Sequence, residues 1–415
     1  MVEYVNRRKK ISKFKALNKV FVGHLPIKSD TVLFQSFFGM YNDNPKYISM
    51  KLHELYPNIK IIWVKSDKKN HDYFPDYVET VEFETLAYYK WSYQANVVVD
   101  NMHGIRGNLN PDSISKRAAI CVLNFFAPLR KKNQYNISTW HGTPLKRLGL
   151  DRHGKNQPKY KRMQGSCDSI IVGCSLTKNA LKTSHFREFP ISFKMYGTPR
   201  NDILLNKSVN INILKKKLSL PADKKIILYA PTFRDYSVND SGVKQMHMID
   251  FSRLFEMLHN KFGGKWCFVF RVHHTVITKI DTDELCASYP EIDLINGNIG
   301  DDMAEYLACS DILITDYSSS MFDFALSKKP VFLFAPDKEH YGNDAVGFYL
   351  SMDSLPFSSS CNNEELLANI AEFEEVDYNA EISEFLKKIG NIEDGHASER
   401  VVEDIKYFLD TGIKR

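Results

Sequence analysis

Residues 312–330, ILITDYSSSMFDFALSKKP, carry the repeating unit that decides the fold. An apolar run ends at Thr315, the serines 318–320 follow, and an amphipathic stretch then leads to the apolar run KPVFLFAPD at 329–337. Short runs rich in β-branched and aromatic residues are typical of buried strands, and the stretch between them has the pattern of a helix. The segment therefore predicts a strand, a helix and a second strand parallel to the first.

The same alternation of strand-like and helix-like stretches continues on both sides of this unit. Further strand-like runs are IKIIWV near residue 60, ANVVVDN near 97, NISTW before 141, SIIVGC near 170, ISFKMYG near 194, KKIILYAPT at 224–232, KWCFVFRVH at 265–273 and IDLIN at 292–296. Amphipathic or basic stretches separate them, such as NPKYISMKLHELYP, in which Pro45 suits the first turn of a helix. Strands that alternate with helices predict parallel sheets covered on both faces.

The length of the chain and the order of its segments predict two domains. A chain of 415 residues exceeds one ordinary core and suits two cores of about 150–200 residues each. The charged, helix-like stretch 202–223 separates the two series of strands and is closed by Pro221. We expect an α/β protein with two doubly wound, Rossmann-like domains at 1–207 and 208–415, and terminal helices able to pack back on the first domain. Open α/β sheets bind ligands at the carboxyl ends of their strands, so we expect the chemistry in the interdomain cleft.

The composition is that of an ordinary globular protein. Hydrophobic residues make up 43%, charged residues 25% and aromatic residues 13%, which argues against a disordered chain. The formal net charge of +5 is too small to indicate a nucleic acid as partner. Basic residues gather at 7–15 and at 116–162, which suits either contact with an anionic membrane surface and phosphate-rich substrates or simply solvated helix faces.

The sequence predicts a cytoplasmic protein whose contact with the inner face of the cell membrane is peripheral. Seven scattered cysteines without a CxxC pair suit reduced thiols, and neither a zinc site nor a disulfide framework. The start, MVEYVNRRKK, lacks the apolar region of a signal peptide. The longest apolar stretch, at 118–129, is shorter than the roughly 20 residues of a membrane-spanning helix.

The stretch STWHGTPLKRLGLD at 138–151 contains the first candidate for chemistry. His141 follows a predicted strand, and an imidazole of ordinary pKa can accept a proton from a hydroxyl at cellular pH. Gly142 permits a close approach of substrate to the backbone, and Lys146 and Arg147 can meet phosphate. The alternative is a histidine that caps a turn for structural reasons.

The second candidate is FRVHHTV at 270–276, again at the end of a predicted strand. Arg271 and His273 lie two residues apart and share one face of an extended strand. A guanidinium beside an imidazole makes electrostatic sense around a phosphate or pyrophosphate. The alternative is an exposed polar strand end.

The third candidate is the start of the helix predicted after residue 317. Asp316 ends the preceding strand, and Ser318 and Ser319 begin a run of three serines. Hydroxyls and unpaired backbone N–H groups at a helix start can bind an anion. An ordinary helix cap needs only one serine, so three beside an aspartate favour ligand binding.

Two further loops present arginines. LYAPTFRDY at 228–236 places Thr232 at a strand end and Arg234 in the loop, where it can clamp a diphosphate. YGTPRND at 196–202 presents Arg200 from a turn shaped by glycine and proline. The alternative for each is an exposed loop arginine without a ligand.

Signatures of several other enzyme classes are missing from the sequence. The chain contains no GxxxxGK, HExxH or GxSxG pattern, which removes P-loop hydrolysis, zinc proteases and serine hydrolases. Histidines and arginines at strand ends remain as the candidate chemical groups.

An ordered set of motifs spans about residues 32–350. The motifs are FQSFFGMYNDNPKYI (34–48), TWHGTPLKRLGLD, YGTPRND, YAPTFRD, FRVH, ITDYSSSMFDFA and GFY (347–349). Together they resemble the CDP-glycerol:poly(glycerophosphate) glycerophosphotransferase family, of the teichoic-acid primase and polymerase type. WHGTPLK and TDYSS are the most specific pieces of this resemblance.

The resemblance implies a GT-B-like transferase, with the donor nucleotide in the C-terminal domain and the acceptor approaching the N-terminal one. The implied reaction moves glycerol phosphate, or a related alditol phosphate, from CDP-glycerol or CDP-ribitol to a hydroxyl of a lipid-linked or polymeric acceptor and releases CMP. Such a step belongs to the synthesis of teichoic acid or a capsule-like polymer of the bacterial cell wall. No cofactor is required by the sequence, and the need for a divalent metal stays open.

Carried over residue by residue, the resemblance places the catalytic base at His141 and a second catalytic histidine, on the donor diphosphate, at His273. The implied donor-binding positions are Thr232, Arg234, Arg271, Asp316, Ser318 and Ser319. Candidates for phosphate or acceptor contacts are Gly142, Thr143, Lys146 and Arg200. In-line attack on phosphorus needs a base on the acceptor side, and cations and N–H groups on the diphosphate.

Two departures from the family pattern bear on specificity. The chain lacks the long N-terminal extension of many polymerases in the family, which favours a single-addition primase or reliance on partner proteins. GNDAVGFY at 342–349 keeps only part of the usual loop, and we expect the choice of alditol to lie there.

Two other interpretations stay open. One is a GT-B glycosyltransferase or epimerase acting on a sugar nucleotide, which the choice of donor distinguishes. The other is a silent scaffold that only docks a nucleotide or a membrane, which binding of CDP without turnover would indicate.

Overall fold

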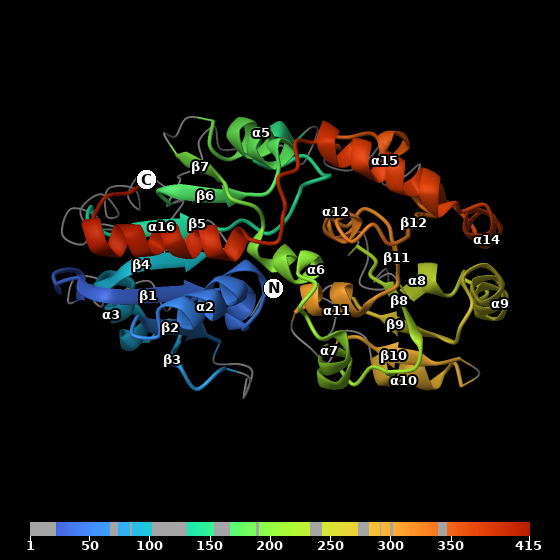
Figure 1. The fold of residues 1–415 in the computed structure, drawn as a ribbon, viewed down its shortest axis with the longest axis horizontal. Helices are drawn as coiled ribbons and strands as arrows, with labels where there is room; N and C mark the ends of the chain where they lie inside the picture. Colours follow the sequence, from blue (N-terminus) through green and yellow to red (C-terminus); the bar gives the residue numbers. More distant parts are fainter. Residues whose placement is uncertain are drawn as a thin grey trace, which may run out of the picture.

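The chain folds into two α/β domains that lie side by side (Figure 1). The computed structural model describes residues 22–66, 74–83, 85–101, 131–152, 167–187, 191–232, 243–272, 282–290, 292–298, 302–338 and 347–415. Each domain is built around a parallel sheet, as the alternation of strands and helices predicts. The two sheets run in the order expected of Rossmann-like domains.

The N-terminal sheet has seven strands among the described residues, in the order β3-β2-β1-β4-β5-β6-β7. Its strands are β1 (Lys28–Gln35), β2 (Lys60–Lys65), β3 (Val78–Glu82), β4 (Ala95–Asp100), β5 (Tyr135–Ser138), β6 (Ser169–Val172) and β7 (Ser192–Met195). All neighbours pair in parallel. The strand order reverses between β1 and β4, so ligand-binding loops are expected at the carboxyl ends of these strands.

The C-terminal sheet repeats this arrangement with six strands in the described ranges, in the order β10-β9-β8-β11-β12-β13. Its strands are β8 (Lys225–Tyr229), β9 (Trp266–Phe270), β10 (Leu294–Asn296), β11 (Ile312–Thr315), β12 (Val331–Phe334) and β13 (Ser358–Ser360). All of these pairs are parallel as well. The order reverses between β8 and β11, which places the TDYSS motif at the switch point of this domain.

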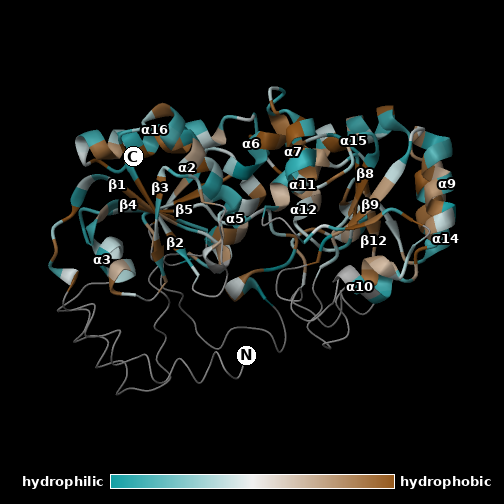
Figure 2. Ribbon diagram, turned by 90° about the horizontal axis from the view of Figure 1, so that it is seen from below, coloured by the Kyte–Doolittle hydropathy of each residue, from teal (hydrophilic) through white to brown (hydrophobic). Residues whose placement is uncertain are grey.

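Helices cover both sheets. The described helices are α2 (Asp43–Leu55), α3 (Leu86–Gln94), α5 (Ser175–Ser184), α6 (Asp202–Leu205), α7 (Ile211–Lys217), α8 (Val243–Met246), α9 (Phe251–Phe262), α10 (Thr282–Ala287), α11 (Met303–Cys309), α12 (Ser320–Ala325), α14 (Asn363–Ala371), α15 (Glu375–Lys388) and α16 (Ala397–Thr411). Short 3-10 turns include η1 (Phe37–Gly39), η2 (Gly149–Asp151), η4 (Pro199–Asn201) and η6 (Met352–Ser354). Figure 2 shows hydrophobic strands inside and helices that carry both hydrophobic and hydrophilic residues outside them.

Every strand predicted from an apolar run is present, and the β11–α12–β12 unit has the predicted form. Three described strands lie outside the predicted runs, each for a physical reason. β1 begins with exposed polar residues, β3 (VETVE) places two valines among glutamates and a threonine, and β13 is a run of serines. Within the described residues β13 lies at the edge of its sheet and pairs with β12 alone, and an edge strand of this kind is defined by backbone bonds and carries no apolar pattern.

The last helix of the chain packs on the first domain (Figure 1). Val401 and Ile405 of α16 belong to the same buried cluster as Val32 of β1 and Ile48 of α2. The chain therefore passes between the domains twice, through α6 and α7 and again between α15 and α16. None of the helices in the described ranges has the length and apolar composition that crossing a lipid bilayer requires.

Candidate active site at the domain interface

The turn after β5 presents His141. Trp140 adopts a left-handed backbone with φ 53°, and Gly142 has φ 129°, a conformation that side chains rarely allow. The fully buried Asn44 of α2 holds this turn, because its Nδ2 donates to the carbonyl oxygens of Thr139 at 3.2 Å and Trp140 at 3.1 Å. The conformation of the turn is thus maintained from a neighbouring helix.

The imidazole of His141 has a defined orientation. Its Nδ1 lies 3.1 Å from the carbonyl oxygen of Asn101, and because a carbonyl only accepts, Nδ1 carries the proton. Nε2 is then the nitrogen that accepts a proton. The ring stacks on Trp140 at 4.1 Å between centroids and meets the edge of Phe37 at 5.3 Å.

The surroundings keep His141 neutral near physiological pH. Burial is the largest influence and lowers the pKa of the imidazole below its ordinary value. The bond to Asn101 and the charge of Asp43 act in the opposite direction, and Arg200 lowers the pKa further. A neutral imidazole with its acceptor nitrogen on Nε2 is the form that a general base requires.

Gly142 brings the two domains into contact. A Cβ atom at this position would lie 3.2 Å from Oγ of Ser319 in the C-terminal domain and 2.6 Å from Nη2 of Arg200. Only a glycine therefore fits between these two side chains. The residue after the candidate base touches the serine run that begins α12.

The guanidinium of Arg200 also connects the turn of His141 with α12. Its Nη1 donates to Oδ1 of Asp43 at 2.9 Å and to the carbonyl oxygen of His141 at 2.9 Å, and its Nη2 donates to Oδ2 of Asp323 at 2.6 Å. Burial lowers the pKa of Arg200, but the two carboxylates more than offset this and raise it. The side chain of Asp323 comes from α12, so one guanidinium joins α2, the backbone of His141 and α12.

A buried carboxyl supports the turn that carries Arg200. Oε2 of Glu393 accepts from the backbone N–H of Thr198 at 2.9 Å, and burial raises the pKa of Glu393 to about 8. A Cβ atom on Gly197 would lie 2.9 Å from the same oxygen. The glycine of YGTPRND is therefore required by packing against the crossover segment before α16.

The GFY motif joins the WHGTPLK motif through backbone bonds. Lys146 and Phe348 form an antiparallel bridge, and the N–H of Tyr349 donates to the carbonyl oxygen of Leu145 at 2.8 Å. The ring of Phe348 stacks on Tyr317 of the TDYSS motif at 5.9 Å. Three motifs that are far apart in the sequence therefore meet at one place.

Asp316 joins the ends of two strands. Its carboxylate accepts from the N–H of Thr232 at 2.9 and 3.0 Å and from the N–H of Tyr317 at 2.5 Å. Oγ of Ser318 accepts from the hydroxyl of Ser320 at 2.9 Å. These bonds fix the backbone conformation just after β8 and β11, where the YAPTFRD and TDYSS motifs lie.

The remaining predicted residues lie in different surroundings. Thr143 contacts α5 within its own domain, 3.6 Å from Sγ of Cys174. Arg271 follows β9, where its Nη1 donates to the carbonyl oxygen of Gly297 at 2.5 Å and its guanidinium lies 4.7 Å from the ring centre of Tyr306. Ser319 precedes α12 without a side-chain capping bond.

Some expectations lie outside what the structure describes. His273 and Arg234 fall beyond the described ranges, and so does most of the basic stretch at 116–162. In the described part of the chain, no three or more His, Cys, Asp or Glu side chains are grouped so that they could hold a metal ion. The six cysteines that are described are free thiols.

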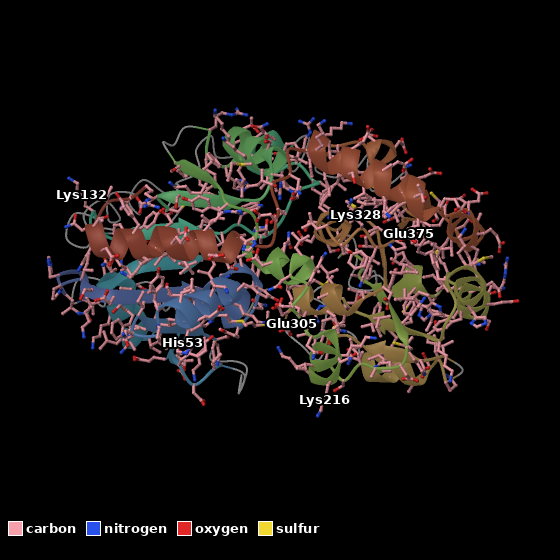
Figure 3. All side chains as sticks on the ribbon, in the orientation of Figure 1. His53, Lys132, Lys216, Glu305, Lys328 and Glu375 are labelled. Carbon is pink, nitrogen blue, oxygen red and sulfur yellow. The ribbon has the colours of Figure 1, made fainter. Side chains whose placement is uncertain are left out.

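A second ionic cluster crosses the interface. Nζ of Lys46 in α2 lies 2.5 Å from Oδ2 of Asp302 and 2.6 Å from Oε1 of Glu305, at the start of and within α11. The hydroxyl of Tyr47 donates to the same oxygen of Asp302 at 2.9 Å. Glu305, labelled in Figure 3, lies where α11 faces the N-terminal domain. All three charged side chains of this cluster are buried.

Sequence reasoning missed the residues that hold the base. Asp43, Asn44 and Asn101 are buried polar residues, and none was singled out from the pattern. A signal existed for two of them, because the NDNP at 42–45 lies inside the FQSFFGMYNDNPKYI motif and precedes a helix. Consecutive polar residues at such a turn are typical of side chains that bond to nearby backbone.

Comparisons with known proteins extend over nearly the whole chain. Residues 17–407 match the family model described as CDP-Glycerol:Poly(glycerophosphate) glycerophosphotransferase. The teichoic acid poly(glycerol phosphate) polymerase of Staphylococcus epidermidis is 31% identical over 90% of this chain and 50% of that protein. The corresponding polymerase of Bacillus subtilis is 30% identical over 97% of this chain and 53% of that protein. The chain thus spans about half the length of these two relatives.

Other relatives match along their full length. The teichoic acid glycerol-phosphate transferase of Staphylococcus aureus is 31% identical over 94% of this chain and 95% of that protein. A solved structure of the wall teichoic acid polymerase TagF, in a histidine-to-alanine variant, has a TM-score of 0.75 and 28% identity over 99% of this chain and 96% of that chain. A histidine-to-asparagine variant of TagF soaked with CDPG has a TM-score of 0.76 and 26% identity over 99% and 98% of the two chains. The fold of the present chain is accordingly GT-B-like, with two Rossmann-like domains.

Proposed function

Because this chain belongs to the CDP-glycerol:poly(glycerophosphate) glycerophosphotransferase family, we propose that it transfers glycerol phosphate, or a related alditol phosphate, from a CDP-alditol to an acceptor hydroxyl. CMP is the released product, and the acceptor is a polymeric or lipid-linked chain of the teichoic acid type. The observation that carries this proposal is the contact between the turn of His141 and Ser319 across the domain interface. It puts a neutral imidazole from one domain beside a hydroxyl-rich helix start from the other.

His141 acts as the base on the acceptor side. Its Nε2 takes the proton of the acceptor hydroxyl as that oxygen attacks the phosphorus that bears the alditol. A new bond forms between the acceptor oxygen and this phosphorus, and the bond from the phosphorus to the bridging oxygen of the diphosphate breaks. CMP leaves with the electron pair of that bond, and the proton stays on the imidazole.

The C-terminal domain holds the donor. We assign contacts with the CDP-alditol to Asp316, Ser318, Ser319 and Thr232, which lie near the ends of β8 and β11. Arg271, Arg234 and His273 belong to the same assignment through their motifs, with His273 on the diphosphate, whose negative charge grows as CMP leaves. Support comes from the strand order, since ligands of open α/β sheets bind where that order reverses.

The residues around His141 divide into two groups. Gly142, Thr143 and Lys146 remain assigned to the acceptor or its phosphates. Arg200 is better suited to hold the base, because two carboxylates and the carbonyl oxygen of His141 are its partners.

Donor choice tests the proposal. The purified chain is incubated with CDP-glycerol, CDP-ribitol or UDP-sugars in the presence of a glycerol-phosphate-primed acceptor, and release of CMP or UDP is followed. We expect CMP from a CDP-alditol and no UDP. Release of UDP would instead identify a sugar-nucleotide glycosyltransferase, and binding of CDP without any turnover would identify a scaffold.

Replacement of the base provides a residue-level test. His141→Ala should lower kcat by about 10²–10⁴-fold, the usual contribution of a general base, while the protein stays folded. His259→Gln is the matched control, because this histidine is exposed on α9 and bonds only within its own helix end among the described residues. Turnover by the His141 variant at the rate of the control would remove the assignment.

We also propose that the protein docks on the inner face of the cell membrane. The support is the sequence alone, with basic residues at 7–15 and 116–162, each worth roughly 1 kcal/mol near an anionic bilayer. Sedimentation with phosphatidylglycerol vesicles at low salt, and release at high salt, is the expected behaviour. Failure to sediment at low salt would contradict it.

A further inference from the structure

Asp43 reaches the candidate base by two independent routes. Its Oδ2 contacts the residue that orients the imidazole, and its Oδ1 contacts the residue that holds the backbone of His141. We propose that Asp43 is a positioning residue for His141, a role that rests on the transferase function proposed above. Neither the sequence pattern nor the family match assigns any role to this aspartate.

The first route passes through Asn101. Nδ2 of Asn101 donates to Oδ2 of Asp43 at 2.9 Å and to Oγ of Ser36 at 3.0 Å. These two bonds fix the side chain of the asparagine, and its backbone carbonyl oxygen accepts from Nδ1 of His141 at 3.1 Å. The carboxylate thereby helps to select the tautomer in which Nε2 accepts the proton.

The second route passes through Arg200. The same Nη1 that lies 2.9 Å from Oδ1 of Asp43 also donates to the carbonyl oxygen of His141 at 2.9 Å. Nη2 of the guanidinium bonds to Asp323 of the other domain. Asp43 thus fixes the base in relation to the helix on the donor side.

The backbone of Asp43 marks the position as unusual. It is the first residue of α2 and has φ 57°, in the left-handed region that costs an L-residue roughly 1–2 kcal/mol. The residue is only 8% exposed. Asparagine tolerates this conformation as well as aspartate does, so Asp43→Asn removes the charge without adding backbone strain.

The charge of Asp43 also matters for the reaction. When His141 takes the acceptor proton it becomes an imidazolium that lies beside the cationic Arg200. Asp43 opposes that repulsion, and it raises the pKa of His141 against the lowering by burial. Of the other groups near the imidazole, burial holds the pKa of His185 at about 4, so that ring is neutral, and Asp323 pairs with Arg200.

The experiment compares Asp43→Asn with the unaltered chain by CMP release from CDP-glycerol across pH. We expect kcat to fall on the order of 10²-fold, because a base that is misplaced by about 1 Å loses this much. We also expect the acidic limb of kcat/KM to move to lower pH. The sign follows from the loss of a neighbouring anion, which lowers the pKa of His141 and leaves the ring neutral at lower pH.

Asp302→Asn is the matched control. Asp302 is also a buried carboxylate that pairs across the interface with α2, but its partner is Lys46 and it has no contact with His141 in the described residues. This variant should lower the melting temperature and leave the acidic limb in place. A limb that moves equally in both variants, or in neither, would overturn the positioning role.

A measurement without turnover separates this inference from the proposed function. Diethyl pyrocarbonate acylates neutral imidazole, so its rate at His141, followed by peptide mass spectrometry across pH, reports the pKa of that ring. The midpoint should lie lower in Asp43→Asn than in the unaltered chain. Absence of CMP release by the unaltered chain would overturn the transferase, whereas equal midpoints in an active enzyme would overturn the role of Asp43.

Discussion

The turn that carries His141 stores backbone strain next to the candidate base. Trp140 and Asp43 are both non-glycine residues with left-handed backbones; Trp140 precedes His141 in the sequence, and Asp43 lies near it in space. Conformations of this kind cost of order 1–3 kcal/mol and persist only where the surroundings over-determine them. Here Asn44 holds Trp140, and Arg200 and Asn101 hold Asp43. The strain is therefore consistent with a side chain that must be presented in one orientation.

At this scale we predict that Gly142→Ala impairs the proposed transfer reaction. The added Cβ meets Nη2 of Arg200 at 2.6 Å, and φ 129° is unfavourable for alanine. The turn must shift away from Ser319, so kcat should fall on the order of 10²-fold. CMP release under saturating CDP-glycerol measures the loss.

Gly263→Ala is the control for this change. Gly263 also has positive φ, at the end of α9, but nothing lies within 4 Å of an added Cβ. It should lower stability by about 1–3 kcal/mol, because φ 65° with ψ 175° is a conformation that side chains rarely adopt, and leave kcat unaltered. Equal rates for the two alanine variants would contradict the predicted importance of close packing at Gly142.

Two helices distant in sequence form one packing unit. α16 lies against α2 and β4, so the C-terminal segment of the chain completes the core of the N-terminal domain. Since α2 also carries Asp43 and Asn44, the packing of α16 supports the base indirectly. The amphipathic pattern of α16 predicts a buried face, but the pattern cannot say which sheet that face covers.

We predict that Ile405→Ala in α16 destabilises the N-terminal domain. Ile405 is fully buried, and truncation of such a side chain typically costs about 2–5 kcal/mol. Urea denaturation followed by tryptophan fluorescence measures the change, since Trp63 and Trp140 lie in this domain. Val376→Ala on α15 is the control, because Val376 is 82% exposed and should change stability by less than about 0.5 kcal/mol. Similar losses in both variants would contradict the packing.

The elements also show where sequence patterns suffice. Ten strands could be predicted because runs such as IKIIWV and WCFVF are buried on both faces of a parallel sheet. Such a continuous apolar run identifies the strand without knowledge of the strand that it pairs with. β13 was not, since its serines take strand form only by pairing with β12. The candidate site shows the same difference. His141 and Ser319 could be found from the sequence because they stand in recognisable motifs. Asn101 could not, because it contacts His141 through its backbone carbonyl oxygen, which every residue type has.

Within the described residues, two buried ionic clusters join the domains across their interface. One joins Arg200 with Asp43 and Asp323, and the other joins Lys46 with Asp302 and Glu305. In the second cluster burial lowers the pKa of Lys46, but its two carboxylates raise it above the ordinary value. Burial raises the pKa of Asp302, but Lys46 and the bonds to Asp302 reverse this and lower it.

We predict that Lys46→Met destabilises the interface between the domains. It leaves Asp302 buried without its cation, which typically costs about 3–5 kcal/mol. The melting temperature measures the loss. Lys51→Met on the same helix is the control, because the pair of Lys51 with Glu54 is exposed and should contribute less than about 1 kcal/mol.

The pH dependence has a defined sign. The contribution of Asp302, whose pKa is depressed, is present above its unfolded pKa and is lost as pH falls through the folded value. The contribution of Lys46, whose pKa is raised, is present below its unfolded pKa and is lost as pH rises through the folded value. Both act near neutral pH, so Lys46→Met should lose most stability there and differ least from the unaltered chain at strongly acidic pH. A constant difference across pH would contradict this account.

The sequence by itself determined the parallel strands, the two-domain order and the motifs at the strand ends. These features follow from local periodicity and residue type, which act within a few neighbouring residues. Only the tertiary structure decided that α16 is the terminal helix that packs on the first domain, that Gly142 lies next to Ser319, and that Asp43 bonds to both Asn101 and Arg200. Those contacts join residues widely separated along the chain, and the hydrogen bonds and close packing that select them exist only once both domains have folded.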